Sequence, residues 1–429
     1  MAEADTTIDT MPIPQRFWWL KRIMAVVVLL AGVVMGLKYW ALAKAQREFV
    51  QLIESIRQGG DPVYAQDFAN AISAGEGGEK LLEAARGFAI SKQVVPAWDR
   101  LPRSAFSNSE KAMIDAVLAA NHQQLKLVRE ARRQPMDFPA YDVTWGTAHG
   151  VPMLNEFMHL ADALSKAGHR SHQNGDDGEA VEYLQDQLSV ERLLEHYPYQ
   201  AAHMIAESIS DQVSQDATST AFHLKIKFDA QEEAAASEEQ VRGLIADLLD
   251  EDRGPRSGWR WRWVGARLMN VNAMAIIERQ TREAPSYARV AAWWNRPIML
   301  WGETNILRAA GAELKAAEAD DLPTALEMLM PANPAGGTKL LWKVRMIRGQ
   351  TMKTHFVQHY QSVRQRRQAA ITLAERLHEL KYGKRAQRVE ELVPEFLPSL
   401  PLDPVAGGGT TLGLSLPMQA PAVREQNTR

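Results

Sequence analysis

Two histidine pairs have a spacing at which their side chains can act together. His355 and His359 are four residues apart in a stretch of helical periodicity, so both rings can face one metal ion. The residues between them are Phe, Val and Gln, so the glutamate of a HExxH metalloprotease motif is missing. His169 and His172 flank a turn and form a second such pair. These pairs leave a metal-dependent hydrolase as one alternative, beside the simpler interpretation of partly exposed helix histidines.

Other signatures of catalysis and cofactor binding are absent from the sequence. The chain has no cysteine, which excludes thiolate metal sites, disulfides and cysteine nucleophiles. It also has no GxSxG, no GxxxxGK[ST] and no GxGxxG after a strand. The glycine run 407–409 is interpreted as a flexible linker, because no helix follows that would direct its N-terminus at a phosphate. We therefore expect no cofactor and favour a non-catalytic protein.

A tryptophan-arginine alternation stands out at 259–263. In a helix, Trp259 and Trp263 stack on one side, and Trp293, Trp294 and Trp301 can join them in one aromatic cluster with arginine on the rings. In an extended segment, the same residues give one apolar and one basic face suited to a lipid interface. Both interpretations, core packing and membrane-surface contact, stay open at this point.

Charge is segregated along the chain, although the 429 residues carry a formal net charge of only −3. Residues 339–388 contain 13 Lys and Arg against 2 acidic residues, whereas residues 207–252 contain 12 acidic residues against 3 basic ones. The simplest interpretation is that the two blocks pack against one another. Alternatively, the basic block contacts a polyanion such as anionic headgroups or an envelope polymer. The candidate contacts are Lys353, Arg364, Arg366, Arg367 and Arg376. No nucleic-acid partner is expected.

An apolar stretch near the N-terminus predicts a transmembrane anchor over residues 17–43. Residues 23–37 are uncharged, and aromatic and cationic residues on both sides extend them to the length of a span. The predicted interface residues are Trp18, Trp19, Lys21 and Arg22 before the segment and Lys38, Tyr39 and Trp40 after it. The alternative is a signal peptide cleaved near Ala41-Leu42-Ala43.

The short tail 1–16 before the anchor favours a signal-anchor arrangement. We therefore expect a single-pass protein of the cell inner membrane, with its large C-terminal domain on the outer, periplasmic side. The lipid bilayer is then one partner. Gly32 and Gly36 form a GxxxG pattern, which allows close approach of two helix backbones and so a homodimer through the membrane.

Helical periodicity recurs after the anchor and predicts an all-α fold. Apolar residues repeat at spacings of three and four, for example at Ala202, Ile205, Ile209 and Val213. We expect a membrane-proximal helical region at 44–150 and a main helical body at 151–393, an irregular bundle of hairpins resembling tetratricopeptide helices. Six prolines and the glycine run predict a flexible, mostly irregular tail over 394–429.

Two stretches, 53–68 after the anchor and 367–404, together resemble uncharacterised single-pass membrane-anchored proteins of planctomycete type. The second stretch also resembles the C-terminal part of type II secretion major pseudopilins, with a helix, a Tyr-Gly turn, a Leu-Val-Pro segment and a Leu-Pro-x-Asp-Pro stop. The matching residues are Tyr382, Gly383, Leu392, Val393, Pro394, Leu400, Pro401, Asp403 and Pro404.

The chain departs from the pseudopilin pattern in its apolar segment, where residues 23–37 contain no glutamate. The resemblance implies membership of an anchored family without an activity to carry over. The leading hypothesis is therefore a membrane-anchored envelope protein that acts as a protein-interaction or scaffold module. The alternatives are an envelope hydrolase or metal-dependent enzyme and a secretion-associated, pseudopilin-like component.

Overall fold

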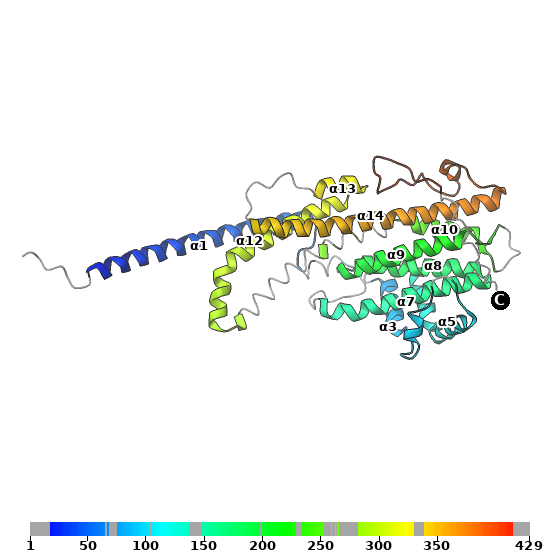
Figure 1. The fold of residues 1–429 in the computed structure, drawn as a ribbon, viewed down its shortest axis with the longest axis horizontal. Helices are drawn as coiled ribbons and strands as arrows, with labels where there is room; N and C mark the ends of the chain where they lie inside the picture. Colours follow the sequence, from blue (N-terminus) through cyan, green and yellow to red (C-terminus); the bar gives the residue numbers. More distant parts are fainter. Residues whose placement is uncertain are drawn as a thin grey trace, which may run out of the picture.

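The computed structural model describes residues 18–64, 67, 75–102, 105–136, 147–197, 200–228, 234–252, 259, 262, 264–265, 282–329 and 339–414. In this part the chain forms twelve α-helices, one 3-10 helix and one pair of two-residue strands (Figure 1). The prediction of an all-α protein with a long apolar N-terminal helix is confirmed. The predicted tail 1–16, Phe17 and residues 415–429 lie outside the described residues.

Helix α1 (Trp18–Gln58) projects from the body at its N-terminal end (Figure 1). Its most apolar 18-residue window has a mean hydropathy of 2.2 and no buried residue, so the helix is long and apolar enough to cross a membrane. At a rise of about 1.5 Å per residue the helix is about 60 Å long, roughly twice the thickness of a hydrocarbon core. Its C-terminal half therefore continues beyond the predicted span.

That C-terminal half of α1 packs against helix α12 (Ser286–Ala317). Ile53, Val63 and Leu307 form a small buried cluster between them, and Phe49, Leu52 and Ile56 pack on it. Arg308 of α12 also pairs with Glu48 at 3.4 Å. The anchor helix is thus joined to the rest of the protein by side-chain packing as well as by the chain.

The main body is a bundle of long helices. Helices α7 (Thr147–Asn174) and α8 (Asp177–Glu195) form an antiparallel hairpin across the turn residues Gly175 and Asp176. Gly175 has a φ of 83°, and the Asp176 carboxylate caps α8 by accepting from the Glu179 amide. Helix α9 (Gln200–Ala221) and the 44-residue α14 (Lys339–Tyr382) complete the bundle with α10 (Glu238–Leu249). The predicted irregular bundle is confirmed.

A parallel pair of two-residue strands closes one end of the body. Strand β1 (Ile226–Lys227) pairs with β2 (Ala236–Ser237), and Ser237 then caps α10 in a capping box with Gln240. This short pair positions α10 beside α8 and α14.

Four shorter helices lie beside α7 and α8. They are α3 (Glu76–Gly87), α4 (Val95–Trp98), α5 (Asn108–Ala120) and α6 (His122–Arg132). Leu81, Trp98 and Ile114 share one hydrophobic core with Phe157 and Leu164 of α7. Figure 1 shows these helices well away from the exposed part of α1. These helices are buried against the main body through a shared core, and the predicted division into a membrane-proximal region at 44–150 and a main body at 151–393 stays a prediction.

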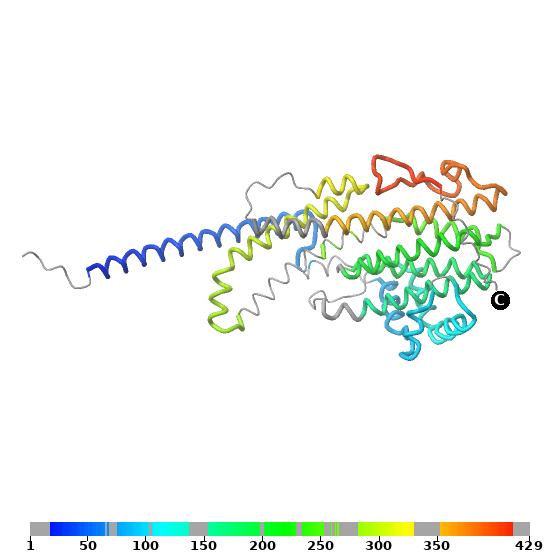
Figure 2. Tube along the Cα trace, in the orientation of Figure 1, coloured from blue at the N-terminus to red at the C-terminus, as the bar shows by residue number. Residues whose placement is uncertain are grey.

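The C-terminal segment folds back over the bundle after α14 and the 3-10 helix η2 (Val389–Leu392), as the red part of Figure 2 shows. It is irregular, as predicted, apart from one antiparallel bridge between Leu402 and Thr411. Its described part is nevertheless packed, since Phe396, Leu397 and Leu412 are buried in the main core. The described portion is therefore docked rather than flexible.

The glycine run is part of that docked segment, which corrects its interpretation as a flexible linker. Gly407 has a φ of 70°, and a side chain there would lie 3.0 Å from Pro323 and 3.2 Å from Asp321. The adjacent Pro404 carbonyl accepts a hydrogen bond from the Leu322 amide at 2.8 Å, at the start of α13 (Leu322–Leu329). The run makes a tight turn against α13, which only glycine accommodates without strain.

Candidate functional site

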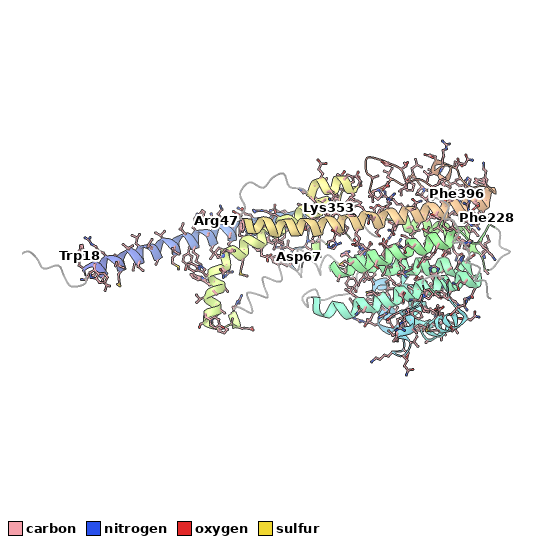
Figure 3. All side chains as sticks on the ribbon, in the orientation of Figure 1. Trp18, Arg47, Asp67, Phe228, Lys353 and Phe396 are labelled. Atoms are coloured by element: carbon pink, nitrogen blue, oxygen red, sulfur yellow. The ribbon has the colours of Figure 1, made fainter. Side chains whose placement is uncertain are left out.

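Aromatic and cationic side chains lie at both ends of the predicted span. Trp18 and Trp19 are more than half exposed, and the Arg22 guanidinium lies 3.8 Å above the Trp18 ring (labelled in Figure 3). At the other end Lys44 lies over Trp40. Trp18 and Trp40 are separated by about 33 Å along the helix axis, which matches a hydrocarbon core. This spacing agrees with a span between Trp18 and Trp40, and the interface residues stay a prediction.

Two of the interface residues predicted after the span, Lys38 and Tyr39, contact helix α12. Lys38 is buried with its ammonium on the Trp293 ring, and the Tyr39 ring packs edge-on against Trp293 at 6.3 Å. Gly32 and Gly36 lie within the exposed part of α1, and among the described residues no atom outside their own helical turns lies within 4 Å of an added Cβ. The face that would meet a second copy is therefore open in the single chain.

The predicted histidine pair lies on α14 but is held by aromatic packing. His359 stacks on Trp259 with ring centroids 4.4 Å apart, and its Nδ1 lies 3.9 Å from the Glu207 carboxylate. His355 is half-buried, and burial lowers its pKa. The described residues contain no group of three or more histidines and carboxylates placed to hold a metal ion.

The other histidine pair is bound to carboxylates. The Asp216 carboxylate accepts from Ser165 at 2.6 Å and contacts His169 Nε2 at 2.9 Å, and all three residues are buried. A nucleophilic triad needs the histidine between serine and acid, but here the acid lies in the middle. His172 contacts Asp177, which also accepts from the Lys225 amide. Both histidines join helices in the body.

The aromatic cluster expected around Trp259 is smaller than predicted. Trp259 is buried edge-on against Phe356 at 4.9 Å, and the Arg262 guanidinium lies 4.7 Å from its ring. Trp293, Trp294 and Trp301 do not join this cluster; they lie on α12 and are 37 to 47% exposed. Trp261 and Trp263 lie outside the described residues. Core packing is thus the correct interpretation for Trp259, and the α12 tryptophans belong elsewhere.

The predicted basic contact residues divide between surface and interior. Lys353 is exposed, and Arg364 is half-exposed beside Asp403 at 3.3 Å. Arg367 is mostly buried and pairs with Glu251 at 2.6 Å. Arg376 is also largely buried, donating to the Leu224 carbonyl and to Glu379.

Arg366 cannot meet an external polyanion, because neither it nor its partner Glu191 has any exposed side-chain surface. The prediction is wrong for this residue. Its charge is satisfied inside the bundle by Glu191 of α8, whereas the basic and acidic blocks meet where Arg367 pairs with Glu251 at 2.6 Å.

Buried ionisable groups continue from this ion pair along the interface of α8, α9 and α14. Burial raises the pKa of Glu195 well above its usual value, and the neighbouring Glu191 raises it further. Burial raises the pKa of Glu207 to about 7, against the opposing effect of Arg262, which lies 3.7 Å away. Burial also lowers the pKa of His203 well below its usual value. We call these buried ionisable groups the polar seam. The pocket that His359 lines beside it has a volume of about 20 Å³, room for about one water molecule.

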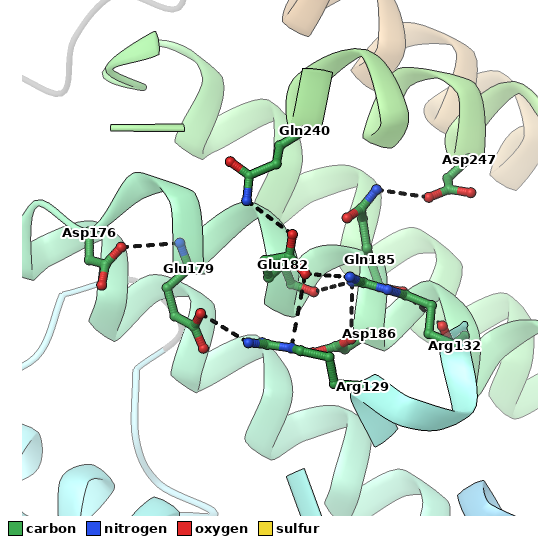
Figure 4. A network of polar contacts seen from close by, with 10 residues as sticks. Arg129, Arg132, Asp176, Glu179, Glu182, Gln185, Asp186, Gln240 and Asp247 are labelled. Carbon is green, nitrogen blue, oxygen red and sulfur yellow. Dashed lines mark hydrogen bonds and ion pairs between the residues drawn. The ribbon is translucent and has the colours of Figure 1, made fainter. Parts of the chain in front are cut away.

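A second polar network joins α6 to α8 (Figure 4). Arg129 and Arg132 each lie 3.0 Å from the buried Asp186 carboxylate, and Arg129 also pairs with Glu179. Arg132 pairs with Glu182, which accepts from Gln240 of α10 at 3.0 Å. Every group in the network has a partner on a neighbouring helix, so the network fixes the helices rather than offering a site.

The residues of the pseudopilin-like motif fold the C-terminal segment onto the bundle. Tyr382 donates to Glu395 at 2.6 Å, and Gly383 turns the chain with a φ of 67°. Asp403 accepts from the amides of Val405 and Ala406, which forms the turn before the glycine run. Five further members pack on the core or supply backbone acceptors; these are Leu392, Val393, Leu400, Pro401 and Pro404. Pro394 is exposed and follows a cis peptide bond. Their roles in this chain are structural.

An open groove lies between the end of α10 and this docked segment. Its volume is about 390 Å³, within the range of protein binding pockets. The α10 side contributes Leu249, Asp250, Glu251 and Asp252, and the opposite wall is the run 398–402, Pro-Ser-Leu-Pro-Leu. Arg367 lies in its floor and is neutralised by Glu251. The lining of the groove thus combines leucine and proline side chains with three acidic residues and one arginine.

Comparison with family models, with curated proteins and with solved structures found no match to this chain. The sequence predicted neither the buried seam nor the groove. The available signal for the seam lies in α8, whose acidic residues fall on two opposite sides of the helix instead of on one solvent-facing side. The groove has no sequence signal, because it arises only when the irregular C-terminal segment docks beside α10.

Proposed function

We propose that this protein is a membrane-anchored, non-catalytic interaction module that binds a cationic, partly apolar segment of a partner protein in the groove beside α10. The observation that carries the proposal is the composition of that groove. Its lining contains three acidic residues, Asp250, Glu251 and Asp252, and one basic residue, Arg367. Such a site favours lysine or arginine beside apolar side chains.

The shape of the wall supports an extended ligand. Pro398 and Pro401 fix the backbone of the wall, and Leu400 and Leu402, on either side of Pro401, provide apolar surface. A short peptide segment in an extended conformation can lie along this wall, with its basic side chains towards the α10 acids. The prolines keep the wall preformed, which reduces the entropy cost of binding.

We further propose that the body lies on the outer, periplasmic side of the cell inner membrane. The support for an anchor is α1, which is long and apolar enough to cross a membrane. Cationic residues before and after the span are balanced, so the side is the part of the proposal that the experiment decides. Alkaline phosphatase fused after Arg429 tests this directly. Activity in intact cells agrees with the proposal, whereas an inactive fusion beside an active cytoplasmic reporter contradicts it.

The binding proposal is tested by peptide selection on the full-length protein in nanodiscs. We expect enrichment of peptides with net positive charge and leucine-like side chains, and loss of that enrichment in the variant Asp250→Asn/Asp252→Asn. The matched control is Glu83→Gln/Asp99→Asn, which removes two exposed acids on α3 and after α4. Equal enrichment by the groove variant and the control overturns the proposal.

A further inference from the structure

Helix α12 is bent (Figure 1), and Pro297 lies inside it. A proline within a helix removes one backbone hydrogen bond and clashes with the preceding turn, which bends the helix. Figure 1 shows the part before the bend turned away from the bundle and across the direction of α1. We call residues 286–301 the α12 arm. Burial within α12 begins only at Leu300, so the arm is largely outside the packed body.

The α12 arm has an exposed apolar stripe. Tyr287, Val290, Trp294 and Ile298 are spaced by three, four and four residues, so they fall on one helix face. Their exposed fractions are 77, 62, 47 and 69%. A face of this kind is costly in water, because it leaves several large apolar side chains hydrated.

The basic residues of the α12 arm lie on the other side of the helix from the apolar stripe. Arg289 and Arg296 are seven residues apart, which places them on the face opposite the apolar stripe. The sequence of the arm contains no aspartate or glutamate. An apolar face with aromatic residues and a basic opposite face is typical of helices that lie in the surface of an anionic bilayer.

The α12 arm contacts α1 at the place where a helix in the bilayer surface would be expected. Trp293 holds Lys38 and packs against Tyr39, at the end of the apolar stretch of α1. The arm therefore leaves α1 at the depth where that helix exits the hydrocarbon core. A helix running across α1 at this depth lies along the bilayer surface.

We propose that the α12 arm is a second membrane-contact element, an interfacial helix whose apolar stripe inserts into the headgroup region of an anionic bilayer. Together with α1 it attaches the protein at two points, so the body keeps one orientation relative to the membrane. Bending at Pro297 allows the arm to follow the surface while the rest of α12 packs on α1. This inference rests on α1 crossing the membrane and does not depend on the proposed groove ligand.

The test uses single cysteines, which the cysteine-free chain accepts without a background label. Full-length Val290→Cys, Ile298→Cys, Arg289→Cys and Glu83→Cys are spin-labelled in nanodiscs of phosphatidylethanolamine and phosphatidylglycerol. Collision with lipid-soluble oxygen and with a water-soluble nickel chelate is then measured. Circular dichroism confirms that each variant keeps its helix content.

The expected result is that oxygen collision dominates at Val290→Cys and Ile298→Cys, and that the ratio inverts at Arg289→Cys and Glu83→Cys. Nickel collision at the stripe positions equal to that at Glu83→Cys overturns the proposal, because the stripe would then be in water. Shielding of the stripe from both reagents also overturns it, because protein would cover the face, whether from a second copy or a partner.

Discussion

Arg366 of α14 and Glu191 of α8 form an ion pair in which neither side chain has any exposed surface. The same guanidinium donates to the carbonyls of Leu248 at 3.1 Å and Asp247 at 3.0 Å, at the end of α10. One side chain therefore joins three helices. These contacts place one charge of the basic block, residues 339–388, inside the bundle. There the Glu191 carboxylate and the two carbonyl groups at the end of α10 surround it.

Replacing Arg366 by methionine is expected to destabilise the body by about 3–5 kcal/mol, because Glu191 then remains buried without a counter-charge. The measurement is denaturant unfolding of the full-length protein in nanodiscs, followed by circular dichroism. The control is Arg364→Met, whose half-exposed pair with Asp403 contributes about 1 kcal/mol or less. The double variant Arg366→Met/Glu191→Met should recover part of the loss. Equal effects of Arg366→Met and Arg364→Met would contradict this account of the ion pair.

Stability should also depend on the protonation of Glu207, whose pKa burial raises from 4.5 to about 7. The folded state then holds the proton more tightly than the unfolded chain does. The contribution of this group is fully present below about pH 4.5 and is lost as the pH rises through about 7, a change on the order of 3 kcal/mol. Unfolding free energies are measured between pH 4.5 and 8 for the wild type and Glu207→Gln.

The difference between these two proteins isolates Glu207, because the neighbours Arg262, His359 and Asp211 are common to both. We expect the stability of Glu207→Gln to rise relative to the wild type across this window. A difference that stays constant with pH would show that Glu207 titrates as an exposed carboxyl.

Much of the helical architecture follows from local sequence patterns. Residues 23–37 are apolar without interruption, and repeats such as Ala202, Ile205, Ile209 and Val213 lie on one helix face. These features depend on neighbours three or four residues away, so a single sequence contains them. Arg366 is different, since a charge on an amphipathic helix normally faces water. Its burial depends on Glu191, 175 residues earlier, which no local pattern records.

The C-terminal segment was harder to predict for a related reason. Its prolines and glycines exclude helix and strand, which indicated irregular structure, but they do not exclude packing. Phe396, Leu397 and Leu412 are buried because α14 and α10 provide a surface for them. The groove beside α10 exists only in this docked arrangement, so the candidate site could not be predicted before the fold.

Docking of that segment should depend on the lack of a side chain at Gly407. The variant Gly407→Ala adds a methyl group 3.0 Å from Pro323, whereas Gly409→Ala adds one with no neighbour within 4 Å. Both glycines have a positive φ, so both variants carry the same backbone cost of about 1 kcal/mol. Limited proteolysis should therefore cut Gly407→Ala near residues 403–414 faster than Gly409→Ala. Equal cleavage of the two variants would show that the contact with α13 does not hold the segment.

The most direct test of the central claim, a groove that binds a cationic segment, is a charge-exchange titration. A selected cationic peptide, and the same peptide with its lysines and arginines replaced by glutamate, are titrated against the wild type and Asp250→Lys/Asp252→Lys in nanodiscs. We predict that the variant binds the cationic peptide at least about tenfold more weakly, a loss of 1.4 kcal/mol, and prefers the anionic peptide. Identical dissociation constants of the cationic peptide for the two proteins would contradict the claim.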